Sequence, residues 1–93
     1  MTGLELDHPV AVNSRANTMR DFCQRPKQAL ADYERAIELA PFWAEPYYER
    51  ALLYESEGDP DRALADLEKA VELAPNWTEA VEDLSRHRGS EGA

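Results

Sequence analysis

The amino-acid sequence predicts an all-α protein, an α-solenoid of about five helices arranged in helix–turn–helix units. The first observation behind this fold class is a repeat. The phrase ALADYERAIELAP at 29–41 returns 34 residues later as ALADLEKAVELAP at 63–75, with ten of the thirteen positions identical. The apolar residues of both copies follow the period of an amphipathic helix, and prolines flank both copies. A repeat of this length is typical of stacked units, because one helix pair cannot bury its apolar face alone.

The first element is a helix within 10–23, and two different faces of it could pack inward. The 34-residue spacing assigns it a largely polar face, made of Asn13, Ala16, Asn17 and Arg20. An apolar stripe lies one residue away, at Val12, Ala16, Met19 and Cys23, with Phe22 beside it. Since one residue is about 100° of rotation on a helix, this helix is turned, shifted, or paired with something outside its own unit. The place of Cys23 on the apolar stripe favours a core thiol.

The second and fourth helices contain the two copies of the repeated phrase. The second covers 29–40 with Pro26 in its first turn, and charged residues such as Asp32 fill the side opposite the apolar stripe. The fourth begins near Pro60, and Asp59 is well placed to cap its first turn. Both helices are therefore predicted to bury one face and to expose the other.

The third and fifth helices precede and follow the second copy. The third is predicted over 44–57 and leads through a tight turn into the fourth, and the fifth is predicted within 76–88. Residues 1–9 are expected to form a flexible N-terminal segment, and residues 89–93 a disordered tail. No stretch of the sequence shows the alternation of a strand.

The 34-residue unit resembles the tetratricopeptide repeat, whose pattern is W-x2-L-G-x2-Y…A-x3-F…P. Residues 44–77 carry this pattern through Tyr47, Arg50, Ala51, Tyr54, Ala63, Leu67 and Pro75, although Arg50 stands in an apolar slot. Residues 10–43 carry it mainly through Ala29, Tyr33 and Pro41. The resemblance implies a degenerate first unit at 10–43, a second unit at 44–77 and a capping helix at 78–88, stacked in a right-handed superhelix.

Composition and charge exclude several classes of function. The chain has 19 acidic and 10 basic residues, a formal charge of −9, which argues against nucleic acid or an anionic membrane as partner. Cys23 is the only cysteine, so the chain can form neither an internal disulfide nor a cysteine-based zinc cluster. The sequence shows neither a membrane-span-length apolar run nor a secretory signal, and we expect a cytoplasmic protein.

Catalytic and cofactor motifs are also missing from the sequence. His8 and His87 stand near opposite ends of the chain, with neither a nucleophile nor a ligand pair beside them, and both are expected to be solvated. There is no glycine-rich phosphate loop. We therefore expect a protein that is not an enzyme and that holds no cofactor and no metal.

In tetratricopeptide repeat proteins the first helix of each unit lines a concave groove, and the resemblance carries this surface to the third and fifth helices. The groove residues are Glu45, Tyr48, Glu49, Leu52, Glu55, Ser56, Glu79, Glu82, Asp83 and Arg86, joined from the first helix by Ser14, Arg15, Thr18 and Asp21. Seven acids against two arginines give the groove a formal charge of −5. Such a groove attracts a Lys/Arg-rich segment of another protein, with Tyr48 and Leu52 as apolar contacts. The alternative is a solvated acidic face without a ligand.

One partner class of the family is disfavoured by these residues. Tetratricopeptide co-chaperones hold acidic carboxy-terminal tails through a clamp of Lys, Asn and Arg. The third and fifth helices here offer mainly Glu, Asp, Ser and Tyr at the groove positions, which would repel an acidic peptide.

Aromatic residues mark the turns between the predicted units. Phe42, Trp43 and Trp77 stand there, and aromatic residues in such turns favour wedging of neighbouring helix pairs. Phe42 and Tyr48 are the best candidates for exposed aromatic side chains.

Self-association is the second hypothesis for function. Two and a half units fall short of the three that usually make such arrays stable. The apolar stripe of the first helix could pack on a second copy or exchange with it, forming a homodimer through Val12, Met19, Phe22 and Cys23.

Overall fold

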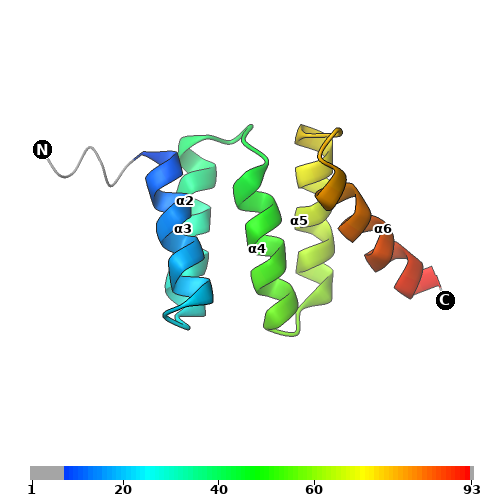
Figure 1. Cartoon of the computed structure of the whole chain (residues 1–93), viewed down its shortest axis with the longest axis horizontal. Helices are drawn as coiled ribbons and strands as arrows, with labels where there is room; N and C mark the ends of the chain where they lie inside the picture. The colour runs from blue at the N-terminus through cyan, green and yellow to red at the C-terminus, as the bar shows by residue number, and fades with distance from the viewer. Residues whose placement is uncertain (1–7, 93) are drawn as a thin grey trace, which may run out of the picture.

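The computed structural model describes residues 8–92 and contains five α-helices joined by short turns (Figure 1). They are α2 (Pro9–Asp21), α3 (Pro26–Leu39), α4 (Glu45–Ser56), α5 (Pro60–Leu73) and α6 (Thr78–Gly92). In Figure 1, α2 and α3 form one pair, α4 and α5 form the next, and α6 lies at the far end of the row. No strand occurs between residues 8 and 92. The all-α fold with stacked helix–turn–helix units is thus confirmed.

Local sequence signals define most helix ends. The prolines at 26 and 60 each stand in the first turn of their helix, and the Asp59 carboxylate accepts a hydrogen bond from the backbone N–H of Arg62 at 3.3 Å. Ala40 and Ala74 leave the helical conformation at the other end. Each precedes a proline, and a residue in that position is sterically disfavoured in the helical region. The prolines on either side of each helix therefore mark both its start and its end.

The two chain ends differ from the prediction. Helix α2 already begins at Pro9, where the His8 imidazole accepts a hydrogen bond from the N–H of Val10 at 3.2 Å. The rest of the predicted flexible segment, residues 1–7, lies outside the described residues. At the other end α6 continues to Gly92. The prediction of a disordered tail is therefore wrong for residues 89–92. The Arg88 guanidinium is paired with the Glu68 carboxylate of α5 at 2.9 Å, so this part of α6 still contacts the second unit.

Two apolar clusters form the core, and each contains residues from three helices. The first joins Ala16, Ala29, Tyr33 and Leu53, from α2, α3 and α4. The second joins Ala51, Ala63, Leu67 and Leu84, from α4, α5 and α6. Alanines at the crossing points let the helix axes approach closely, and the larger side chains fill the space between them. Each helix pair is thus completed by the first helix of the next unit.

The first unit contains one extra residue in its interhelical turn. The turn between α2 and α3 has four residues, 22–25, whereas the turn between α4 and α5 has three, 57–59. Accordingly, the N–H of Arg25 reaches back six residues to the carbonyl of Met19, whereas that of Asp59 reaches back five to Tyr54. Met19 is therefore the counterpart of Tyr54, at a spacing of 35 residues.

This extra residue settles how the first helix packs. With a 35-residue spacing, Ala16 corresponds to Ala51, and both are fully buried in equivalent clusters. The apolar stripe faces inward: Val12 is buried and Met19 packs against the first cluster. Helix α2 is thus shifted by one residue within its own unit. The prediction of a core thiol was wrong, because α2 ends at Asp21 and Cys23 lies exposed in the longer turn.

Both interhelical turns need one residue in the left-handed conformation, at equivalent places in the repeat. Gly58 fills this place with φ of 79°, and Gln24 fills it with φ of 53°. A residue with a Cβ atom pays about 1–2 kcal/mol in this region. Nothing lies within 4 Å of a Cβ atom added at Gly58, so the strain of a substitution there is in the backbone alone.

We predict opposite effects for two exchanges in these turns. Gln24→Gly is expected to raise the free energy of unfolding by up to about 1 kcal/mol, and Gly58→Ala to lower it by about 1 kcal/mol. Urea unfolding followed by circular dichroism measures both values. A stabilising Gly58→Ala, or a destabilising Gln24→Gly, would contradict the assignment of these turns.

Candidate functional site

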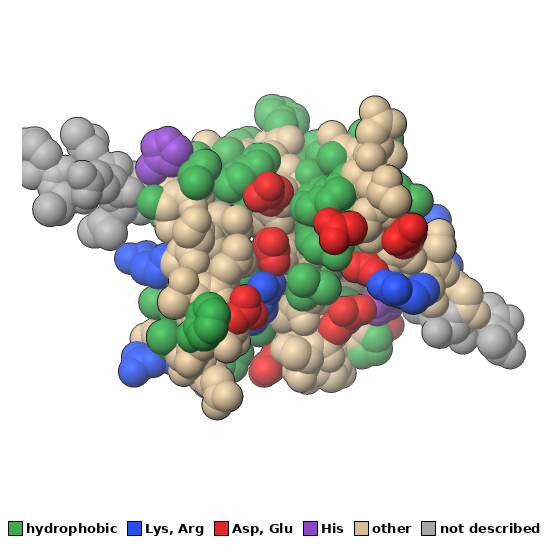
Figure 2. Space-filling view, viewed as in Figure 1, with side chains coloured by type: hydrophobic (Ala, Val, Ile, Leu, Met, Phe, Trp, Pro, Cys, Tyr) green, Lys and Arg blue, Asp and Glu red, His purple; other side chains and the backbone are tan. Residues whose placement is uncertain are grey.

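The predicted groove residues of α4 and α6 lie on one face of the molecule, which we call the acidic face. Its members are Glu45, Tyr48, Glu49, Leu52, Glu55, Glu79, Glu82 and Asp83. Figure 2 shows acidic side chains gathered over α4 and α6, with apolar side chains beside them. Their spacing of three and four residues places them on one side of each helix.

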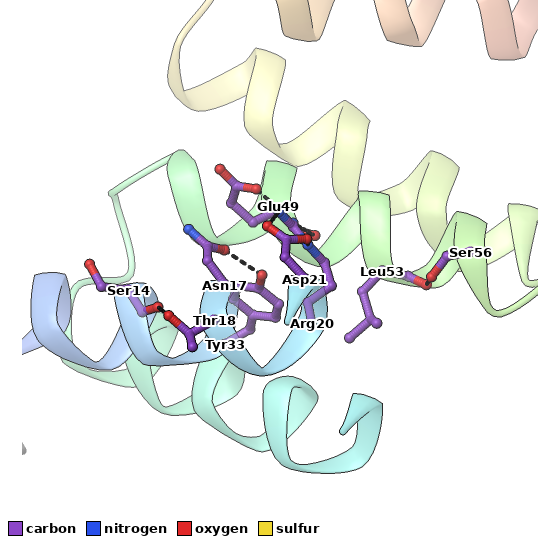
Figure 3. Close-up of polar contacts among 9 residues, drawn as sticks. All are labelled: Ser14, Asn17, Thr18, Arg20, Asp21, Tyr33, Glu49, Leu53 and Ser56. Atoms are coloured by element: carbon purple, nitrogen blue, oxygen red, sulfur yellow. Dashed lines mark hydrogen bonds and ion pairs between the residues drawn. The ribbon is translucent and has the colours of Figure 1, made fainter. Parts of the chain in front are cut away.

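One acid of this face connects α4 to α2 (Figure 3). The Arg20 guanidinium donates to the Glu49 carboxylate at 2.7 Å and to the Glu49 backbone carbonyl at 3.2 Å. Its Nε also donates to Asp21 at 2.7 Å. Hydrogen bonds to Asp21 and Glu49 raise the pKa of Arg20 against the opposing effect of burial, and the bond to Arg20 lowers the pKa of Asp21. Glu49 is therefore neutralised within the chain.

A second polar contact lies beside this ion pair. The Tyr33 hydroxyl of α3 donates to the Asn17 amide oxygen of α2 at 2.5 Å (Figure 3). Burial raises the pKa of Tyr33, because a phenolate loses its hydration inside the protein. One turn earlier on α2, Asn13 is also buried, and its amide oxygen has no hydrogen-bond partner among the described residues.

A second acid connects α6 to α4 in the same way. The Tyr48 hydroxyl donates to the Asp83 carboxylate at 2.6 Å, and Arg86 forms an ion pair with the same carboxylate. Burial raises the pKa of Tyr48, and the negative charges of Glu79 and Glu49 add to this effect. Asp83 lies 34 residues after Glu49. The same place in the repeat thus supplies the acid that ties each first helix to the one before it.

Three acids of the acidic face form no ion pair within residues 8–92. They are Glu45, Glu79 and Glu82, and all three are exposed. Glu55, in contrast, contacts the imidazole of His87, which is mostly buried, so the expectation of a solvated His87 was wrong. The charge that the face presents to solvent is therefore concentrated at the amino-terminal ends of α4 and α6.

The contribution expected from the first helix is partly different. Arg15 turns away from this face and forms two hydrogen bonds with Asp32 of α3, at 2.7 and 2.9 Å. Arg20 takes its place beside the acids. With Asp21 included, seven acids still face two arginines, so the formal charge remains −5.

The pairing of Arg15 has a counterpart in the second unit. Arg50 donates two hydrogen bonds to Asp66 of α5 at 2.7 and 2.8 Å, and its guanidinium lies 5.8 Å from the ring centroids of both Tyr47 and Tyr54. The hydrogen bond to Asp66 raises the pKa of Arg50. This arrangement explains how a charged residue occupies a slot that is usually apolar.

The prediction that Asp32 lies on a solvated side of its helix was wrong, since it is buried, as is its counterpart Asp66. The signal that could have revealed both is their spacing, since each lies three residues after one packing alanine and four residues before the next, at 29 and 36 in the first copy and at 63 and 70 in the second. This spacing places the carboxylate near the packed face, where it needs a partner.

The residues proposed for self-association are divided between core and surface. Val12 and Met19 pack inside the chain, whereas Phe22 is 83% exposed and Cys23 is exposed in the same turn. A second copy that docks on this structure would meet only the last two. Homodimer formation stays a prediction.

Two further properties of the described residues bear on function. Between residues 8 and 92, no group of three or more His, Cys, Asp or Glu is arranged to hold a metal ion. No helix in that part of the chain combines the length and the apolar character needed to cross a membrane.

Comparison with known proteins identifies relatives of this fold. A family model described as tetratricopeptide repeat matches residues 24–88. The chain is similar to a solved structure titled "Crystal structure of MamA", with a TM-score of 0.81 and 26% identity, over 98% of this chain and 53% of that one. A second, "Crystal structure of MamA protein", has a TM-score of 0.79 and 26% identity, over 98% and 49%. The chain thus spans about half the length of these structures. No curated protein sequence matches it significantly.

The two arginine–aspartate pairs are expected to differ in their contribution to stability. The side chains of Arg50 and Asp66 are 18% and 8% exposed, whereas that of Arg15 is 46% exposed and can turn into water. We predict that Asp66→Asn lowers the free energy of unfolding by about 3 kcal/mol, and Asp32→Asn by about 1 kcal/mol. Urea unfolding of both variants measures the difference. Equal losses would show that burial of the arginine does not decide the cost.

The phenol of Tyr48 is expected to ionise at a higher pH than free tyrosine. Because its pKa is raised in the folded state, its contribution to stability is present below about pH 10 and is lost as the pH rises through the folded value. The difference in phenolate absorbance between the wild-type chain and Tyr48→Phe, followed during alkaline titration, should have its midpoint above pH 10. A midpoint at or below that of free tyrosine would contradict the burial of this phenol beside Glu79 and Glu49.

Proposed function

We propose that this chain, which belongs to the tetratricopeptide repeat family, is a non-catalytic module that binds a segment of another protein on its acidic face. Proteins of this family are typically scaffolds rather than enzymes. The shared fold and the family match support the general role, and the charges of the acidic face support the kind of partner.

The exposed acids carry the argument for the partner. Glu45, Glu79 and Glu82 have no ion-pair partner in the described part of the chain, so their charges remain available to an incoming group. A segment rich in Lys or Arg would be attracted over a distance and would gain ion pairs on contact. Leu52 and the ring of Tyr48, which are both half-buried members of the acidic face, offer apolar contact to the stems of such side chains.

The internal ion pairs decide which acids can be tested. Glu49→Lys would place a second cation against the half-buried Arg20 and would break the tie between α4 and α2. Loss of binding would then be indistinguishable from loss of structure. Glu45 and Glu82, in contrast, can be exchanged without removing a contact between helices.

We predict that reversal of these two charges abolishes most of the binding to a basic peptide. The double variant Glu45→Lys/Glu82→Lys should bind a short peptide of alternating Lys and Ser at least about tenfold more weakly than the wild-type chain. The wild-type affinity should itself fall as salt is raised from about 50 to 300 mM. Isothermal titration calorimetry measures both effects.

A matched control separates local charge from total charge. Glu38→Lys/Glu72→Lys changes two exposed acids on α3 and α5, each of which forms only a surface ion pair within its own helix. Both double variants change the net charge by the same amount, and the control is expected to retain nearly the wild-type affinity. Equal weakening by the two variants would refute a specific role of the acidic face.

A further inference from the structure

An apolar hollow lies where the turn between α3 and α4 meets the turn between α5 and α6. We call it the aromatic hollow; it is lined by Phe42, Trp43, Ala44, Glu45, Leu73, Ala74 and Trp77. The two turns contain equivalent stretches of the repeat, LAPFW at 39–43 and LAPNW at 73–77. The hollow thus forms between matching parts of successive units.

The aromatic side chains of the hollow are more exposed than a purely structural role requires. Phe42 is 84% exposed, and Trp43, Leu73 and Trp77 are each only half-buried. The counterpart of Phe42 in the second copy is the polar Asn76. The packing of the repeat therefore does not require a phenyl ring at position 42. A concave group of exposed aromatic side chains is typical of an interaction site.

The hollow is continuous with the acidic face. The ring centroid of Trp77 lies 4.7 Å from that of Tyr48, and its indole N–H donates to the Glu79 carboxylate at 3.4 Å. Glu45 belongs to both surfaces. In Figure 2 apolar side chains lie directly beside the acidic ones at the upper end of α4. One ligand could therefore contact both surfaces at once.

We infer that the aromatic hollow binds one large apolar side chain, leucine or aromatic, carried by the same Lys/Arg-containing segment that the acidic face attracts. This inference rests on the proposed function and adds the specificity that charge alone does not supply. The carboxylates of Glu45 and Glu79 at the edge of the hollow favour a cationic residue next to the apolar one. The apolar side chain would bury its surface against Phe42, Trp43 and Leu73.

Intrinsic fluorescence can report occupancy of the hollow directly. Trp43 and Trp77 are the only tryptophans of the chain, and both line it. Two peptides serve as probes: one of alternating Lys and Ser with a central Leu, and one with Ala in its place. The Leu peptide is expected to bind about tenfold more tightly, in keeping with partial burial of one leucine, and to shift the tryptophan emission to shorter wavelength. This difference should persist at high salt.

The two phenylalanines of the chain provide a matched pair of variants. Phe42→Ala should remove most of the difference between the two peptides while it leaves the salt-dependent binding of the Ala peptide intact. Phe22→Ala, at an equally exposed phenylalanine in the turn between α2 and α3, should leave the difference unchanged. Because both rings are exposed, neither exchange is expected to disturb the core.

The outcomes separate this inference from the proposed function. Equal binding of both peptides would overturn the role of the hollow, but the proposed role of the acidic face would stand. Binding of neither peptide would overturn both. An emission shift on concentrating the chain alone would show that a second copy fills the hollow, and would overturn the inference as well.

Discussion

The structure depends on one packing constraint: a single helix pair has no second layer on which to bury its apolar face. The clusters around Tyr33 and Leu67 show how the chain meets this constraint. Alanines from both helices of a unit meet at the crossing, a large side chain from the second helix fills the gap, and Leu53 or Leu84 from the next helix completes the cluster. The last helix, α6, thus serves the second unit as α4 serves the first.

The same stacking determines which charges remain for a partner. Glu49 of α4 pairs with Arg20 of α2, and Asp83 of α6 accepts a hydrogen bond from Tyr48 of α4. These two contacts connect successive first helices, and Arg86, on the same helix as Asp83, also pairs with its carboxylate. The acids nearer the amino-terminal ends of α4 and α6 have no such task. The proposed interaction surface therefore consists of the acids that remain unpaired among the described residues after the contacts between units are made.

Polar groups inside each unit are also paired with one another. Arg50 takes an apolar place of the repeat because Asp66 pairs with it and two tyrosine rings flank its guanidinium. In the first unit Arg15 reaches Asp32 instead, from a helix displaced by one residue. A buried charge is tolerated only with its partner, so the pairing of an arginine with an aspartate in both units has a physical reason. The longer turn at 22–25 lengthens the separation of the two residues along the chain from 16 in the second unit to 17 in the first, and the pair still forms.

The sequence by itself determined the five helices, the ends of the two that contain the repeated phrase, and the stacking of the units, because periodicity, prolines and the repeat can be recognised without tertiary contacts. It also placed the acids of α4 and α6 on one face of each helix by their spacing, and the resemblance to the tetratricopeptide repeat assigned that face to a groove. The tertiary structure decided the rest. Whether Asp32 is solvated or buried depends on an arginine 17 residues away, and the place of Cys23 depends on where α2 ends. The free or paired state of each acid on the acidic face, and the hollow between two turns 34 residues apart, exist only once the helices are packed, because both arise from contacts between residues distant in sequence.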